Sequence, residues 1–96
     1  METVMVNKGN WSGETVPMKV DRKTGKFKVH DHHFRMEILP EDGAFQEAVL
    51  YGDEWGEEPL MHGCKYKGMW EFYHCGISRD HADPYVAAMQ VLFNTL

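Results

Sequence analysis

The C-terminal segment constrains the fold most, because its apolar residues repeat at the spacing of one helix face. Asp83 is a favourable N-cap residue, and Pro84 fits the first position of a helix. A helix with one apolar face must bury that face against another layer, so we expect this helix to pack on a sheet. The residues of the predicted stripe are Tyr85, Ala88, Met89, Leu92, Phe93 and Leu96.

Residues 16–29 give the clearest strand signal. Apolar and polar residues alternate on both sides of the segment Asp21–Gly25, which has the composition of a tight loop. Gly25 would occupy the position in that loop that requires a positive φ. The pattern therefore predicts a β-hairpin.

The next alternating segment predicts a third strand over Phe34–Ile38, which ends before Pro40. Its alternation is out of step by one residue with that of the hairpin, so we expect a turn or bulge within His30–His33. Two earlier segments are predicted as a strand over Thr3–Val6 and a loop over Gly9–Gly13 that holds Trp11.

Residues 40–49 are predicted to form a short helix, with acids in its first turn and a stop at Gly52. Residues 53–63 are predicted as a loop, and Tyr66–Ile77 as one central strand bracketed by Gly68 and Gly76, with Cys75 as a small core residue. The expected fold is one α+β domain over residues 1–96, with a small antiparallel or mixed sheet of about four strands and two helices, in the order β-β-β-α-β-α.

Charge is distributed unevenly along the chain. Residues 1–36 carry +3, residues 37–63 carry −8 and residues 64–96 carry 0, which together give the net charge of −5. A segregated charge distribution selects binding partners, whereas a uniform one mainly keeps a protein in solution. The acids of the middle segment are Glu37, Glu41, Asp42, Glu47, Asp53, Glu54, Glu57 and Glu58.

The acidic segment also contains Tyr51 and Trp55, and aromatic residues surrounded by charge are typical of interface hot spots. The sequence therefore favours a protein-binding module, an inhibitor or modulator that occupies a basic surface of a partner. That surface could itself be one that binds nucleic acid, by analogy with phage-encoded inhibitors whose acids mimic phosphates. The predicted contacts are Tyr51, Asp53, Glu54, Trp55, Glu57 and Glu58.

Direct binding of this chain to nucleic acid is disfavoured by its net negative charge. Clustered bases occur locally at the tip of the predicted hairpin, where a solvated turn also accounts for them. These bases are Arg22, Lys23 and Lys26.

A zinc-binding domain is the first alternative, because the chain contains six His and two Cys. His62 and Cys64 would share one face of a strand or loop, but no C-x2-C pair is present and the spacing matches no established zinc motif. The candidate ligands are His32, His62, Cys64, His74 and Cys75.

A second alternative is a structural subunit of a homo-oligomer, such as a homodimer, that buries Trp55 or Trp11 in a symmetric contact. No arrangement of nucleophile, base and oxyanion-stabilising glycines is evident, so we expect no enzymatic activity and no cofactor. The longest apolar run is far shorter than the roughly 18 residues that span a bilayer, and no signal peptide is recognisable. The sequence therefore predicts a cytoplasmic protein with reduced thiols and no membrane segment.

Overall fold

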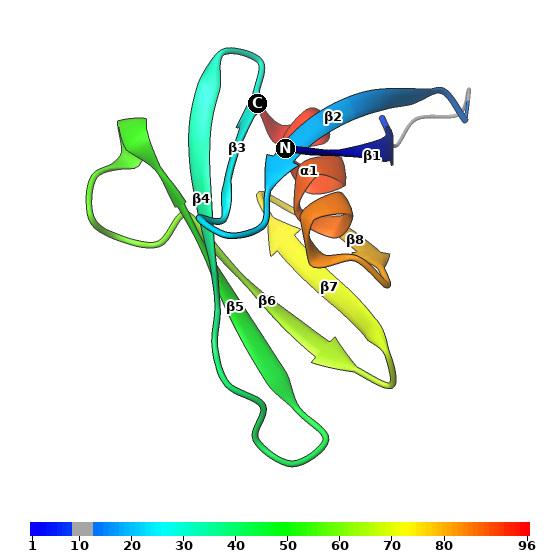
Figure 1. The fold of residues 1–96 in the computed structure, drawn as a ribbon, viewed down its shortest axis with the longest axis vertical. Coiled ribbons are helices and arrows are strands. Elements are labelled where there is room, and N and C mark those ends of the chain that lie inside the picture. The colour runs from blue at the N-terminus through cyan, green and yellow to red at the C-terminus, as the bar shows by residue number, and fades with distance from the viewer. Residues whose placement is uncertain (9–12) are drawn as a thin grey trace.

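The strands of this protein follow one another in the sheet in the same order as in the chain, and a helix comes last (Figure 1). The computed structural model describes residues 1–8 and 13–96, so Trp11 and the loop predicted around it lie outside the described residues. In the described part, one antiparallel sheet contains eight strands. The elements are β1 (Glu2–Asn7), β2 (Thr15–Asp21), β3 (Lys26–Val29), β4 (His32–Ile38), β5 (Gln46–Gly52), η1 (Asp53–Trp55), β6 (Met61–Tyr66), β7 (Met69–His74), β8 (Ile77–His81) and α1 (Pro84–Thr95).

The core lies between the inner face of the curled sheet and α1 (Figure 1). Alternate strand residues point inward, and those with the largest fully buried side chains include Phe34, Leu50 and Phe72. The predicted C-terminal helix is confirmed, and the Asp83 carboxylate accepts a hydrogen bond from the Tyr85 N–H at 3.0 Å.

The buried surface of α1 is wider than the predicted stripe, because the sheet curls around the helix. Pro84, Val86, Ala87 and Val91 are buried together with most of the expected residues. Leu96, predicted as the last member of the stripe, is 41% exposed. A helix inside a curled sheet is covered on more than one side, so a single-face pattern underestimates its burial.

The predicted hairpin is confirmed. Gly25 has a φ of +78°, and its N–H donates to the Asp21 carbonyl at 2.7 Å. The Gly25 carbonyl in turn accepts a hydrogen bond from the Met36 N–H at 2.8 Å, which ties the loop to β4. The turn expected within the next histidine-rich segment is also present, with positive φ at both His30 and Asp31.

The predicted fold class is wrong in its number of strands and in its second helix. The segment predicted as a helix contains β5, which pairs with both β4 and β6. Ala48, Val49 and Leu50 are consecutive and all buried, as in a central strand. A short apolar run has no periodicity that separates a strand from a helix, and the preceding acids belong to a loop, not to a first helical turn.

The segment predicted as one strand and the loop before it also need correction. The loop ends earlier than expected, because β6 begins at Met61. The predicted strand corresponds to β7, bracketed by Gly68 and Gly76 as expected, and a further strand, β8, follows. Lys67–Gly68 and Cys75–Gly76 have positive φ throughout and form two-residue hairpin turns. Cys75 is therefore exposed in a turn and is not a core residue.

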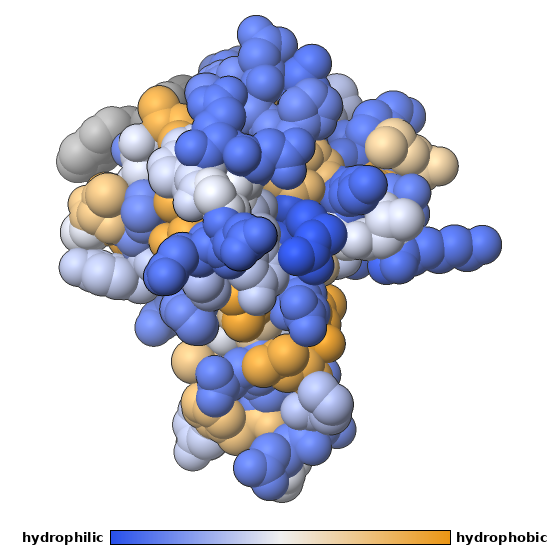
Figure 2. Space-filling view, turned by 90° about the vertical axis from the view of Figure 1, so that its left-hand side faces the viewer, coloured by the Kyte–Doolittle hydropathy of each residue, from blue (hydrophilic) through white to orange (hydrophobic). Residues whose placement is uncertain are grey.

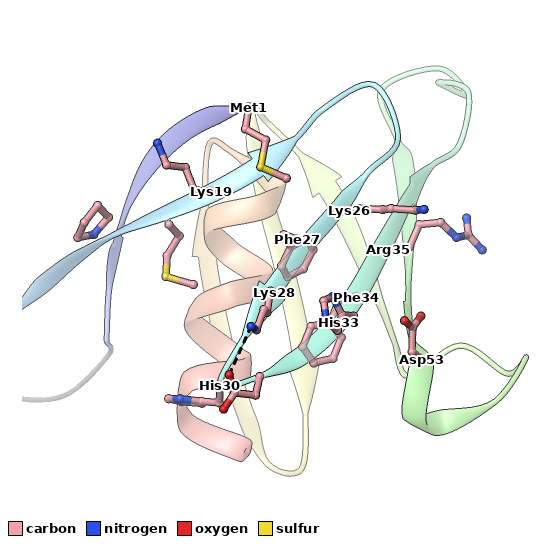
Figure 3. A pocket seen from close by; sticks show the side chains of 13 residues that line it. Met1, Lys19, Lys26, Phe27, Lys28, His30, His33, Phe34, Arg35 and Asp53 are labelled. Carbon is pink, nitrogen blue, oxygen red and sulfur yellow. Dashed lines mark ion pairs between the residues drawn. The ribbon is translucent and has the colours of Figure 1, made fainter.

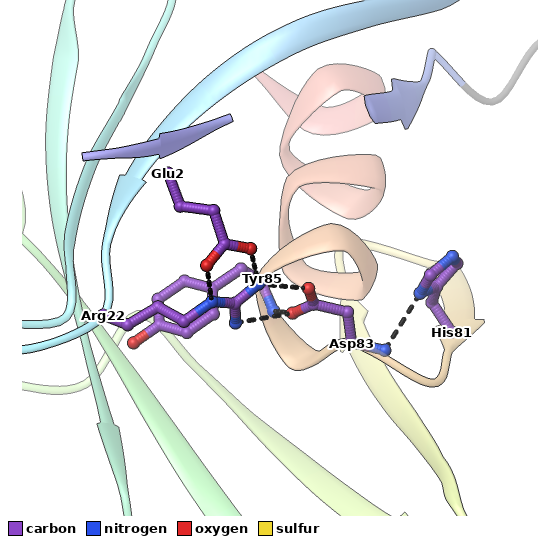
Figure 4. A network of polar contacts seen from close by, with 5 residues as sticks. All are labelled: Glu2, Arg22, His81, Asp83 and Tyr85. Carbon is purple, nitrogen blue, oxygen red and sulfur yellow. Dashed lines mark hydrogen bonds and ion pairs between the residues drawn. The ribbon is translucent and has the colours of Figure 1, made fainter. Parts of the chain in front are cut away.

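A network of charged side chains joins β1, the β2–β3 loop and the start of α1 (Figure 4). The Arg22 guanidinium donates to both Glu2 carboxylate oxygens at 2.8 Å and to Asp83 Oδ2 at 2.7 Å. It also lies over the Tyr85 ring, 5.2 Å from the centroid. Arg22, predicted as part of a basic solvated tip, is thus engaged in holding the N-cap residue of α1. The hydrogen bonds from Arg22 keep the pKa of Glu2 below its usual value.

The contribution of Glu2 to stability should depend on pH. The pKa of Glu2 is lower in the folded state than the value of 4.5 for the unfolded chain. The contribution of Glu2 to the free energy of unfolding is therefore present above pH 4.5 and is lost as the pH falls through the pKa of the folded state. We expect Glu2→Gln to lower the melting temperature near pH 7, and this deficit to become smaller as the pH falls below 4.5. Thermal unfolding of both proteins across this range measures the effect. Glu58→Gln is the control and should show no such dependence; a Glu2→Gln deficit that is constant with pH would contradict the role of this carboxylate.

Candidate protein-binding face

Residues 53–58 form an acidic loop that leaves the end of β5, and we call it the acidic loop. Its first part is the single 3-10 turn η1, which ends at Gly56 with a φ of +75°. The Trp55 ring stacks on Phe34 at a centroid distance of 5.7 Å and meets His32 edge-on at 5.6 Å. The Cβ of a side chain at Gly52 would overlap with that ring, so this glycine makes room for the tryptophan. The loop is thereby anchored to β4.

Glu54 provides a second attachment of the loop to β4. Its Oε2 lies 2.9 Å from Nδ1 of His32, within ion-pair distance. This nitrogen is buried and makes no directed hydrogen bond, so the contact depends on charge when the imidazole is protonated. Of the predicted contacts, Glu54 and Trp55 therefore hold the loop in place, and Trp55 is still 37% exposed.

The other three acids among the predicted contacts are directed to solvent, whereas Tyr51 is half-buried. Asp53, Glu57 and Glu58 are exposed, and within the described residues none of them has an ion-pair partner. A hollow of about 500 Å³ lies beside the loop and is lined by Tyr51, Asp53 and Glu57, among others. The guanidinium of Arg35 covers the Tyr51 ring at 4.6 Å from its centroid. The six predicted residues thus lie close together. Glu54 and Trp55 anchor the loop, Asp53, Glu57 and Glu58 are acids without ion-pair partners in the described part of the chain, and Tyr51 lies beside them under Arg35.

The acidic segment does not form one surface. Glu41 and Asp42 lie in the β4–β5 loop, at the opposite end of β5 from the acidic loop, and a strand of this length separates them by about 20 Å. Glu37 and Glu47 are exposed on the outer face of β4 and β5. On the side shown in Figure 2, hydrophilic residues dominate the upper part, and hydrophobic residues reach the surface on the projecting lower part. Sequence proximity therefore overestimates how concentrated these charges are.

The candidate zinc ligands are dispersed. His62 and Cys64 share the outer face of β6 and are exposed, as their spacing predicts. His74 ends β7, Cys75 lies in the following turn, and His32 is held against the acidic loop on β4. In the part of the chain that the structure describes, no three His, Cys, Asp or Glu side chains are grouped as a metal ion requires.

The environment of Cys64 also disfavours a thiolate ligand. Although Cys64 is exposed, partial desolvation by its neighbours raises the pKa of this thiol, and the carboxylates of Glu47 and Glu71 on the neighbouring strands raise it further. Both cysteines are free thiols in the structure.

A second feature of this face was not predicted. A groove of about 1030 Å³ extends from β2 across the β3–β4 hairpin to Asp53, and bases predominate among its charged residues (Figure 3). Part of the signal is visible in the sequence, since Lys26 and Lys28 alternate with buried residues and so share one strand face. What the sequence does not show is the register that places Arg35 and His33 opposite them. The bases of the groove are Lys19, Lys26, Lys28, His30, His33 and Arg35.

Comparison with known proteins found no matching family model, no similar curated protein and no similar solved structure. Within the described residues, no helix combines the length and the apolar character needed to cross a membrane. The arguments on function therefore depend on the geometry and charge of the face described above.

Proposed function

We propose that this protein is a protein-binding module that attaches to a basic surface of a partner through the acidic loop. The observation that carries the proposal is that three free carboxylates, Asp53, Glu57 and Glu58, lie on a loop that is fixed to β4. A preorganised loop loses little conformational entropy on binding, and its charges accelerate association with a basic partner. Occupation of such a surface would inhibit or modulate the partner.

Within the acidic loop, some residues anchor the backbone and others are available for contact with a partner. Trp55 and Glu54 hold the backbone against Phe34 and His32, and the exposed edge of Trp55 adds apolar contact area beside the carboxylates. Aromatic side chains next to complementary charge supply most of the affinity in many interfaces. Salt should weaken the interaction, because the charges lie on the exposed surface.

The test is a double charge reversal, Glu57→Lys with Glu58→Lys, measured with a fluorescein-labelled oligolysine peptide as the basic probe. We expect the Kd to increase about tenfold at low salt, because two favourable charges become repulsive. The melting temperature should be nearly unchanged, since both side chains are exposed. Fluorescence anisotropy and thermal unfolding measure the two quantities.

The matched control is Glu41→Lys with Asp42→Lys, which changes the net charge equally at the other end of β5. This variant should weaken binding of the peptide by less than about twofold. Equal losses in the two double variants would show that only net charge matters and would refute the acidic loop as the contact.

A further inference from the structure

The sheet is nearly divided between β2 and β3. β1 and β2 pair over six residues, but β2 and β3 pair only at Val20 with Phe27 and at Asp21 with Lys26. Among the described residues, β2 has no strand partner on the side of β3 from Lys19 back to Thr15, and β3 has none on the side of β2 beyond Phe27. Unpaired strand edges are ready to accept an added strand.

The groove described above lies at this division (Figure 3). Pro17, Met18 and Lys19 of β2 line one side, and Lys26 to Lys28 of β3 lie on the other. Met18 is partly buried against the core, and its flexible side chain offers an adaptable apolar contact. A segment bound here would meet apolar surface and main-chain hydrogen-bonding groups together.

One pair of like charges and one lysine–histidine pair face each other across β3 and β4 on the outer face. Lys26 pairs directly with Arg35, and Lys28 pairs with His33. Opposed bases at such positions destabilise a sheet unless an anion lies between them. Lys28 has one exposed partner, Asp31, at 3.4 Å, and Arg35 has Glu37 at 3.7 Å, whereas Lys26 has no ion-pair partner in the described part of the chain. Lys26 thus presents positive charge to an occupant without an ion-pair partner of its own in the described residues, beside the exposed ion pairs of Lys28 and Arg35.

The groove suits an acidic peptide better than a single-stranded nucleic acid. Binding of single strands depends on exposed aromatic faces on which bases stack. Phe27 and Phe34 are only 3% and 2% exposed, and the Tyr51 ring is covered by Arg35. In an extended chain with alternating acidic and apolar residues, the acids can face the basic residues of the groove and the apolar residues can contact Met18. The backbone of such a chain can pair with the free strand edges.

We propose that the groove between β2 and the β3–β4 hairpin binds an acidic, extended segment of a partner protein by addition of a strand. Carboxylates of the segment would lie between Lys26, Lys28 and Lys19, and its apolar side chains would contact Met18. Asp53 marks the end of the groove, where a further acid would be repelled. This site adjoins the acidic loop at Asp53 and has the opposite charge preference.

The probe for this proposal is a fluorescein-labelled ten-residue peptide of alternating glutamate and valine. We expect the variant Lys26→Glu with Lys28→Glu to bind it at least tenfold more weakly than the natural sequence, measured by anisotropy at low salt. The control is Lys65→Glu with Lys67→Glu, which has the same charge change and spacing outside the groove. It should change the Kd by less than about threefold.

Strand addition is tested separately by methylation of alternate backbone nitrogens in the same peptide. Loss of binding is expected, because the methylated nitrogens cannot donate to a strand edge. Three results would overturn the proposal: equal losses in both double variants, tighter binding of an oligothymidine of the same length, or full binding of the methylated peptide. The proposal would also be overturned if this chain formed dimers in solution and the double variant Lys26→Glu with Lys28→Glu dissociated them. That result would assign the groove to a second copy of the chain.

Discussion

Gly25→Ala is expected to destabilise the protein by about 2–5 kcal/mol, one of the two largest single effects that we predict. An alanine Cβ at this position would meet the carbonyl group of Met36, with which it would overlap sterically. The obstacle is backbone of β4, which cannot rotate away as a side chain can. The φ of +78° adds a conformational cost for any residue with a Cβ. Chemical denaturation of the variant and of the natural sequence measures the difference.

Gly68→Ala is the matched control, since Gly68 has a φ of +81° but no heavy atom within 4 Å of the added Cβ. It should cost about 1 kcal/mol, which is the conformational contribution alone. The difference between the two variants therefore isolates the contact with β4. Similar losses at both positions would show that the packing of the β2–β3 loop on Met36 contributes nothing.

Phe72→Ala is expected to cost about 3–5 kcal/mol, because its side chain is fully buried between the sheet and α1. The ring lies directly over Gly63 on the neighbouring strand, and a Cβ at Gly63 would overlap with it sterically. Gly63→Ala alone should also destabilise, by about 1–3 kcal/mol, since the ring has no free space to move into.

The two substitutions should not be additive. Once the ring of Phe72 is removed, a methyl group at Gly63 enters empty space and its cost should disappear. We expect the double variant to be more stable than the sum of the single effects implies, by about 1–3 kcal/mol. Denaturant unfolding of all four proteins measures this coupling, and simple additivity would contradict the close packing of ring and glycine.

The parts of the fold that were predictable from the sequence are those with a local cause. The N-cap at Asp83 and the loop closed by Gly25 are determined by residues close to one another in the chain. The central strand β5 was mistaken for a helix because Ala48–Leu50 are buried on both faces, which removes the alternation that identifies a strand. The turns at Lys67–Gly68 and Cys75–Gly76 were missed because their first residues rarely adopt a positive φ.

The candidate site was predictable in part for a similar reason. The residues 51–58 are contiguous, so the sequence identified them as a group, but it gave no sign that Trp55 packs on Phe34. The groove depends on the register of β3 with β4 and on the separation of β2 from β3, which are properties of the sheet. No local sequence pattern predicts that Lys26 pairs with Arg35 on the neighbouring strand.

The order of the elements, with α1 after the eight strands of the described residues, has a consequence for synthesis on the ribosome. Every strand pairs with its immediate predecessor, so hairpins can form one after another as the chain emerges. The inner face of the sheet nevertheless has no cover until Pro84–Thr95 have been released, because those residues fill it. Until then Phe34, Leu50 and Phe72 lack their apolar cover, and exposed apolar surface of this kind promotes association between chains.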